Sequence, residues 1–283
     1  MSHRHSSQNR MRHIFFCASL IACLTACGSG GKSNGSGPQS PGGFWGDPDA
    51  GGGLVSFLIA ENGDLQAQLR LDGAFSPLLG AGTVSVTQNN VLSGSFELAG
   101  DISPLPNPQG EDLGCSVSGT VLERQSLSVD VTCADSNGVV YDETLAMMYD
   151  GSIYERESSL DAIAGNYTFP FQPDTNYLSI TGDGTIMGSF HNFGAQCLVN
   201  GTAAIIDADY TLLDISWTMS SCIDLFPNID IDLFPNIDYE GVQVSGFAIE
   251  ILSPTGAPGG YFFILTGRAG DRVFSINVGY DRI

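Results

Sequence analysis

The segment from Cys115 to Cys133 constrains the fold of this chain more than any other part. It reads CSVSGTVLERQSLSVDVTC, and apolar residues or cysteines alternate with Ser, Thr and Asp on both sides of a central turn. This alternation predicts a pair of antiparallel strands, each with one buried face. Folding the chain about Arg124 places Val121 opposite Leu127. The same register places the two cysteines opposite each other on the buried face, where we expect a disulfide bond.

Short apolar runs separated by turn residues continue along the chain after residue 43. Residues 54–60 and 65–71 flank Glu-Asn-Gly-Asp, and residues 177–181 and 185–190 flank Gly-Asp-Gly, which are both hairpin signals. No segment shows a convincing helical period. Many short strands with tight turns predict an all-β chain, an antiparallel meander that forms β-barrels or sandwiches rather than alternating β and α units.

A second copy of the cysteine hairpin follows the first. C-S-V-S-G-T-V from Cys115 and C-L-V-N-G-T-A from Cys197 share Cys, Val, Gly and Thr at the same offsets, and each precedes another strand that ends in cysteine. We therefore expect two tandem β-domains of common descent, residues 44–157 and 158–283. Chance similarity between strand-rich segments is the alternative explanation.

The four cysteines of these hairpins predict two disulfide bonds, Cys115 with Cys133 and Cys197 with Cys222. In the second hairpin the bulky residues of 213–219 have odd numbers, whereas Cys222 has an even number. A β-bulge, or a position of Cys222 in the following loop, is therefore required to bring this cysteine to Cys197.

The beginning of the chain carries an export signal. Two residues of basic character precede an apolar run from Ile14 to Ala26, which is too short to cross a membrane as a helix. The run leads into Leu-Thr-Ala-Cys, which resembles the lipobox of bacterial lipoproteins. The resemblance implies that residues 1–26 are a signal peptide, that Cys27 carries acyl chains such as palmitate, and that Gly28 favours sorting to the outer membrane.

Residues 27–43 consist mainly of Gly, Ser and Pro, and they predict a flexible lipidated tether between the membrane and the folded part. The resemblance leaves open whether the protein faces the periplasm or the outside. The membrane, reached through the N-terminal lipid, is the partner that the sequence predicts, and any protein or glycan partner stays unidentified.

The charge of the chain limits its partners. It contains 31 acidic and 10 basic residues, and three of the basic residues lie in the signal peptide. A protein this acidic does not present the Lys and Arg surface that nucleic acids require. His191 is the one histidine after residue 26, so a site built on several histidines is excluded, and we predict no cofactor and no metal site.

The octapeptide Ile-Asp-Leu-Phe-Pro-Asn-Ile-Asp at 223–230 is repeated without change at 231–238. Its acids and rings form a candidate loop interaction site for a cation or an apolar partner, whereas a duplication tolerated in an exposed loop is the simpler explanation. Neither this segment nor the other acidic turns complete a calcium loop with its closing Glu. The candidate residues are Asp224, Phe226, Asp230, Asp232, Phe234 and Asp238.

No catalytic constellation is recognisable, and a Gly-x-Ser-x-Gly motif is absent from the sequence. We therefore expect a non-enzymatic envelope or cell-surface lipoprotein with a structural or interaction role. The first alternative is a module that binds a glycan or a small apolar ligand. Trp45, Tyr210 and Trp217 are available to stack on such a ligand, although core packing is the commoner role of such rings. The weaker alternative is a hydrolase with paired carboxylates.

Overall fold

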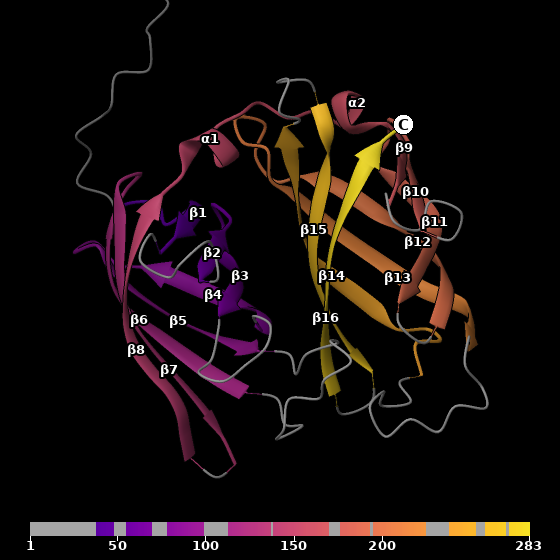
Figure 1. The fold of residues 1–283 in the computed structure, drawn as a ribbon. Coiled ribbons are helices and arrows are strands. Elements are labelled where there is room, and N and C mark those ends of the chain that lie inside the picture. Colours follow the sequence, from indigo (N-terminus) through magenta and orange to yellow (C-terminus); the bar gives the residue numbers. More distant parts are fainter. Residues whose placement is uncertain are drawn as a thin grey trace, which may run out of the picture. The chain divides into compact units, whose positions relative to one another are not determined.

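The strands of the protein form two closed antiparallel barrels that follow one another along the sequence (Figure 1). The structure is a computed structural model, and it describes residues 38–47, 55–69, 78–98, 113–136, 138–169, 176–192, 195–224, 238–252, 258–269 and 272–283. Within these residues each barrel has eight strands, which confirms the expected all-β fold of two tandem antiparallel domains. Contacts divide the chain into residues 1–36 and a compact unit, 37–283, that contains both barrels.

Barrel 1 is a meander in which each strand pairs with the next one in the sequence. The first strand closes the barrel on the last one, with Trp45 opposite Tyr149 and Gly46 opposite Met148. The strands are β1 (Gly43–Gly46), β2 (Ser56–Ile59), β3 (Asp64–Leu69), β4 (Leu78–Val86), β5 (Val91–Leu98), β6 (Leu113–Leu122), β7 (Ser126–Asp135) and β8 (Gly138–Tyr149).

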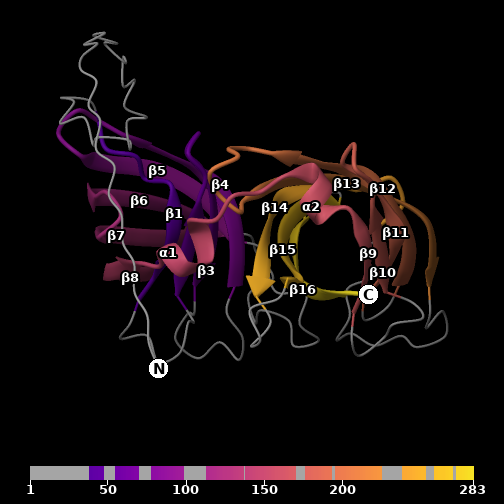
Figure 2. The same ribbon diagram turned by 90° about the horizontal axis from the view of Figure 1, so that it is seen from above.

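Barrel 2 has the same meander order, and Figure 2 looks down into its ring of strands. Its first strand pairs with both neighbours, since Thr168 lies opposite Tyr177 on one side and Asp281 on the other. The strands are β9 (Gly165–Thr168), β10 (Tyr177–Ile180), β11 (Thr185–Asn192), β12 (Ala195–Ile205), β13 (Leu213–Asp224), β14 (Gln243–Leu252), β15 (Pro258–Ala269) and β16 (Arg272–Arg282).

Two single-turn helices, α1 (Gly151–Tyr154) and α2 (Leu160–Ile163), connect the barrels. A polar side chain caps the start of each one. The Asp150 carboxylate accepts a hydrogen bond from the backbone N–H of Ser152, and the Ser159 hydroxyl accepts one from the backbone N–H of Ala162. Ser158, where we divided the two domains, lies in this connecting segment.

The first cysteine hairpin has the predicted register. Cys115 lies opposite Cys133 and Val121 opposite Leu127, and Arg124 adopts a positive φ in the turn between the strands. Side chains alternate between buried and exposed along β6, as the sequence pattern requires. The disulfide bond between the two cysteines is formed, with their Cα atoms 4.0 Å apart.

The second disulfide bond is also formed, between Cys197 and Cys222, and it needs the predicted irregularity. Gln196 lies opposite Ile223, but Leu198 lies opposite Ser220, so one strand holds an extra residue at this point. This β-bulge moves Cys222 to the face of β13 that carries the odd-numbered core residues. The mismatch in residue numbering along the sequence therefore has a structural cause.

The repeated sequence motif occupies different strands of the two barrels. In both copies the phenylalanine of Gly-Ser-Phe lies opposite the first cysteine, Phe96 with Cys115 and Phe190 with Cys197. The first copy begins the sixth strand of barrel 1, β6, whereas the second copy begins the fourth strand of barrel 2, β12. The copies therefore match in their local pairing but are offset by two strands in the barrel order.

A third apolar cluster contains side chains from the outer faces of both barrels. On β2, Phe57 and Ile59 belong to the core of barrel 1, whereas Leu58 between them belongs to this third cluster. Phe247 on β14 and Tyr154 on α1 are buried in the same cluster. β2 is thus buried on both faces, unlike the half-exposed strands β6 and β7.

Candidate functional site

Most of the candidate residues near the N-terminus and in the repeated loop lie outside the described residues: Cys27, Phe226, Asp230, Asp232 and Phe234. The remaining two lie at the borders of the gap. Asp224 ends β13, where its backbone pairs with Ala195, and Asp238 is exposed and accepts a hydrogen bond from the backbone N–H of Glu240 over 3.0 Å. Lipidation and the loop site stay predictions.

The interiors of the two barrels differ in chemistry. Barrel 1 is filled mainly by Leu and Val, together with Trp45, Phe57 and Phe96. Barrel 2 buries a larger set of rings, and neighbouring rings lie close together. Their members are Tyr167, Phe190, Trp217, Tyr261, Phe263 and Tyr280. Barrel 1 also contains a contacting ring pair, Phe57 with Phe96 at 5.9 Å between ring centroids, so the barrels differ in the number of contacting rings. Barrel 2 has the larger set, and aromatic side chains are common in the lining of small-molecule sites.

The rings of barrel 2 form a continuous series through its interior. The ring centroid of Trp217 lies 6.5 Å from that of Phe190 and 5.9 Å from that of Phe263. The Phe263 ring in turn contacts the Tyr280 ring edge-on at 5.6 Å. Tilted and edge-on arrangements at these distances are attractive for aromatic pairs. The series places the indole of Trp217 between two phenyl rings.

The indole N–H of Trp217 has no hydrogen-bond acceptor among the described residues, although this side chain is only 1% exposed. The other tryptophan differs in this respect. Trp45 is equally buried, but its Nε1 donates a hydrogen bond to the carbonyl oxygen of Pro41 over 2.9 Å. An indole N–H is a donor only, so Trp217 retains one unused donor inside barrel 2.

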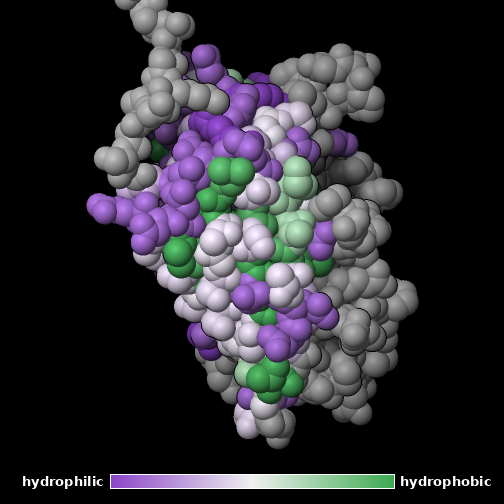
Figure 3. Space-filling view, turned by 90° about the vertical axis from the view of Figure 1, so that its left-hand side faces the viewer, coloured by the Kyte–Doolittle hydropathy of each residue, from purple (hydrophilic) through white to green (hydrophobic). Residues whose placement is uncertain are grey.

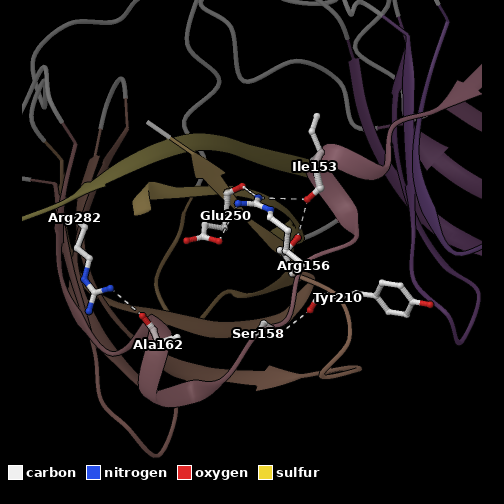
Figure 4. Close-up of polar contacts among 8 residues, drawn as sticks. Ile153, Arg156, Ser158, Ala162, Tyr210, Glu250 and Arg282 are labelled. Atoms are coloured by element: carbon white, nitrogen blue, oxygen red, sulfur yellow. Dashed lines mark hydrogen bonds and ion pairs between the residues drawn. The ribbon is translucent and has the colours of Figure 1, made fainter. Parts of the chain in front are cut away.

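An ion pair lies at the end of barrel 2 near α1 (Figure 4). Arg156 donates to the Glu250 carboxylate over 3.1 Å and to the Glu250 backbone carbonyl over 2.7 Å. The two side chains are only 22% and 18% exposed. Arg282 donates to the backbone carbonyls of Ala162 and Ala164, and Ile163 between them is fully buried in the core of barrel 2. The connecting segment is thus fixed to this end of the barrel.

Buried tyrosines stay protonated in this environment. Burial raises the pKa of Tyr280, and its hydroxyl lies 3.4 Å from the side-chain oxygen of the buried Asn176. Burial also raises the pKa of Tyr261, with the negative charge of Glu250 as the next cause. Both hydroxyls are therefore neutral hydrogen-bonding groups rather than charged ones near neutral pH.

A polar cluster accompanies the third apolar cluster between the barrels. Arg124, in the turn between β6 and β7, forms an ion pair with Glu155 at 3.2 Å and donates to the hydroxyl of Tyr210. Its guanidinium also lies 5.6 Å from the centre of the Tyr210 ring, in cation–π geometry. Tyr210 in turn stacks on Tyr154 of α1, with centroids 4.7 Å apart. Tyr210 therefore has a structural partner on each side.

Two acidic side chains, Asp64 on β3 and Asp214 on β13, lie close enough to influence each other. Burial raises the pKa of Asp214, and the negative charge of Asp64 raises it further. Both residues lie on outer strand faces, because the inward positions of their strands are held by core residues such as Leu65 and Ile215. The described residues contain no group of three or more His, Cys, Asp or Glu side chains placed to hold a metal ion.

The outer face of barrel 1 carries small hydroxyl and carboxylate side chains. Thr144 donates to the Asp130 carboxylate over 2.6 Å, and Thr132 donates to the Asp142 carboxylate over 2.9 Å, both across β7 and β8. On the face shown in Figure 3, hydrophobic residues form small separate patches among hydrophilic and intermediate ones. Such scattered apolar residues are normal for a solvated surface.

The sequence did not identify Arg156, Glu250 or the unsatisfied N–H of Trp217. Arg156 and Glu250 are separated by 94 residues, so only the fold brings them together. No protein-family model, curated protein or solved structure matches this chain. In the described part of the chain, no helix has the length and hydrophobicity that crossing a membrane requires.

Proposed function

We propose that this chain is a lipid-anchored protein of the bacterial outer membrane with a non-enzymatic structural or interaction role. The observation that carries the proposal is the sequence Leu-Thr-Ala-Cys at the end of the apolar run 14–26. Acyl chains on Cys27 contribute about 0.8 kcal/mol for each buried CH₂ group, and more than one chain makes attachment stable without a spanning helix.

Two further features support an exported protein. The four cysteines of the barrels are all paired in disulfide bonds, and such bonds persist in oxidising compartments outside the cytosol. The Gly- and Ser-rich residues 28–38 provide a tether between the lipid and the barrels, since Gln39 and Pro41 are already hydrogen-bonded to residues of barrel 1. Its average reach is about 17–20 Å by the random-coil relation, which separates the barrels from the lipid surface.

The anchor is tested by replacing Cys27 with Ala in a diderm bacterium grown with an alkyne analogue of palmitate. We expect the wild-type chain to be labelled and to fractionate with the outer membrane, and the Cys27→Ala chain to be unlabelled. Cys23→Ala is the matched control, because this cysteine lies in the same apolar run but outside the lipobox. Equal labelling of Cys27→Ala and wild type would refute lipidation at Cys27.

The face of the membrane is tested by protease treatment of intact and gently lysed cells, with a tag after Ile283. Digestion in intact cells indicates surface display and a partner outside the cell. Protection until lysis indicates a periplasmic face and a partner within the envelope, provided that a denatured sample is digested.

The binding alternative now differs between the two barrels. An interior filled by Val, Leu and Phe counts against a ligand site, and barrel 1 comes close to this description, whereas the Trp and Tyr rings of barrel 2 favour one. The hydrolase alternative is weaker, because Asp64 and Asp214 lie on outer strand faces rather than around an enclosed substrate. A small-molecule site in barrel 2 is therefore the second candidate function.

A further inference from the structure

The indole N–H of Trp217 is an unsatisfied donor in the interior of barrel 2. A buried donor without an acceptor destabilises a fold, because its hydrogen bond to water is lost and not replaced. A phenylalanine at this position would fill much of the same volume without that cost. The presence of Trp217 therefore suggests that its N–H has an acceptor when the protein functions.

Barrel 1 provides an internal comparison. In the first cysteine hairpin Gly119 lies opposite Val129, and in the second hairpin Gly201 lies opposite Trp217. Trp217 thus occupies the place that an aliphatic side chain fills in barrel 1. Since Trp45 of barrel 1 already donates to a backbone carbonyl, the unused indole donor belongs to barrel 2.

The surroundings of Trp217 define what an acceptor would look like. The neighbouring rings of Phe190 and Phe263 have no oxygen or nitrogen atom, so neither can accept the indole hydrogen bond, and they make the surroundings of Trp217 apolar and aromatic. The charges of Arg156 and Glu250 at the end of the barrel compensate each other. Burying an unpaired ligand charge among these rings is unfavourable, so a neutral ligand fits best.

We infer that the interior of barrel 2 binds a small, neutral aromatic molecule whose carbonyl or equivalent oxygen accepts a hydrogen bond from Nε1 of Trp217. The inference goes beyond the proposed anchoring and does not depend on Cys27. An eight-stranded barrel is just wide enough either to be filled by side chains or to hold one small ligand. Direct binding measurements distinguish a barrel filled by side chains from one that holds a ligand.

The test uses the chain from Gly28 to Ile283, which retains the whole compact unit with both barrels. The probe is prodan, a neutral naphthalene ketone whose emission shifts to the blue in apolar surroundings. We expect saturable binding to the wild-type chain and about tenfold weaker binding to Trp217→Phe, which keeps a ring but removes the donor. Trp45→Phe, the same substitution in barrel 1, is the matched control and should bind as the wild type does.

A second probe isolates the hydrogen bond. 2-(Dimethylamino)naphthalene lacks the ketone, so it should bind the wild-type chain and Trp217→Phe with equal affinity. The absence of saturable prodan binding to the wild-type chain would show that side chains fill the barrel and would overturn the inference. Equal prodan affinity of Trp217→Phe and the wild type would overturn the role of the indole donor.

A second measurement uses the wild-type chain, so the inference can be tested even if Trp217→Phe does not fold. The chain contains two tryptophans, so ¹⁵N-labelled indole groups give two N–H signals, which Trp45→Phe assigns. Prodan should shift the Trp217 signal downfield and leave the Trp45 signal unchanged. If neither signal moves, or if both move equally, the ligand site in barrel 2 is refuted.

Discussion

The glycine of each Cys-x-Val-x-Gly-Thr motif has a packing role that a pair of substitutions tests. A Cβ atom at Gly119 would lie 2.0 Å from the backbone oxygen of Ser128 and 2.7 Å from the Cα atom of Val129. Both atoms belong to the backbone of β7, so no side-chain rotation relieves the contact. We expect Gly119→Ala to force β6 and β7 apart by roughly 1 Å at this point.

The cost of this displacement is about 2–3 kcal/mol, the upper part of the range for overpacked core sites. With a urea dependence of about 2 kcal/mol/M, the unfolding midpoint should fall by about 1 M or slightly more. Trp45 is fully buried in barrel 1, so its fluorescence reports unfolding of this barrel when Trp217 is replaced with Phe. The Trp217→Phe chain is the reference for both glycine variants.

Gly114 is the matched control, because it lies on the same strand and a Cβ there would meet no atom within 4 Å. Gly114→Ala should leave the midpoint unchanged or raise it slightly, since alanine reduces the freedom of the unfolded chain by about 0.4–1 kcal/mol. If Gly119→Ala were as stable as Gly114→Ala, the close approach of β6 and β7 would not be the reason for the glycine.

Three further predictions use the same unfolding assay. Replacing Cys115 and Cys133 with Ala should destabilise barrel 1 by about 3 kcal/mol, because the bond closes a loop with a sequence separation of 18. Asp214→Asn should stabilise the protein at pH 7 but not below about pH 4, because a carboxyl whose folded pKa is raised by burial and Asp64 opposes folding only when ionised. Phe247→Ala should cost about 3–5 kcal/mol, because Phe247 is buried in the cluster that both barrels share. The transition that Trp45 reports in the Trp217→Phe chain should then separate from the transition that Trp217 reports in a Trp45→Phe chain; coincident transitions would contradict this coupling.

The alternation of side chains was sufficient to predict local pairing. The sequence around Cys115 and Cys133 contains both the period of a half-buried strand and two cysteines that fix its register. The even number of Cys222 likewise predicted either a bulge or a position in the following loop, because a regular strand cannot place odd and even residues on one face, and the structure has the bulge. These features are local, because they depend on the residues of one hairpin and not on the rest of the fold.

The contacts between distant parts of the chain could not be read in this way. Leu58 lies between Phe57 and Ile59 in an unbroken apolar run, and such a run does not show which residue faces the core and which faces another domain. Arg156 and Glu250 are polar residues in unremarkable segments, and only the packing of the connecting segment against β14 brings them together. Whether the indole N–H of Trp217 has an acceptor depends on the side chains around it, so the sequence did not predict that this donor is unsatisfied.

The offset of the repeated motif affects how the two barrels are compared. A strand-by-strand comparison would align β6 with β14 instead of with β12. Trp217 would then have no counterpart in the first cysteine hairpin. Comparison by local pairing sets β6 and β7 against β12 and β13, and it superimposes the cysteines, the glycines and their partners. In a closed meander every strand has two neighbours, so a shift by one hairpin preserves all of these contacts. Val129 is therefore the physical counterpart of Trp217, and the indole donor is a difference between the barrels at equivalent positions.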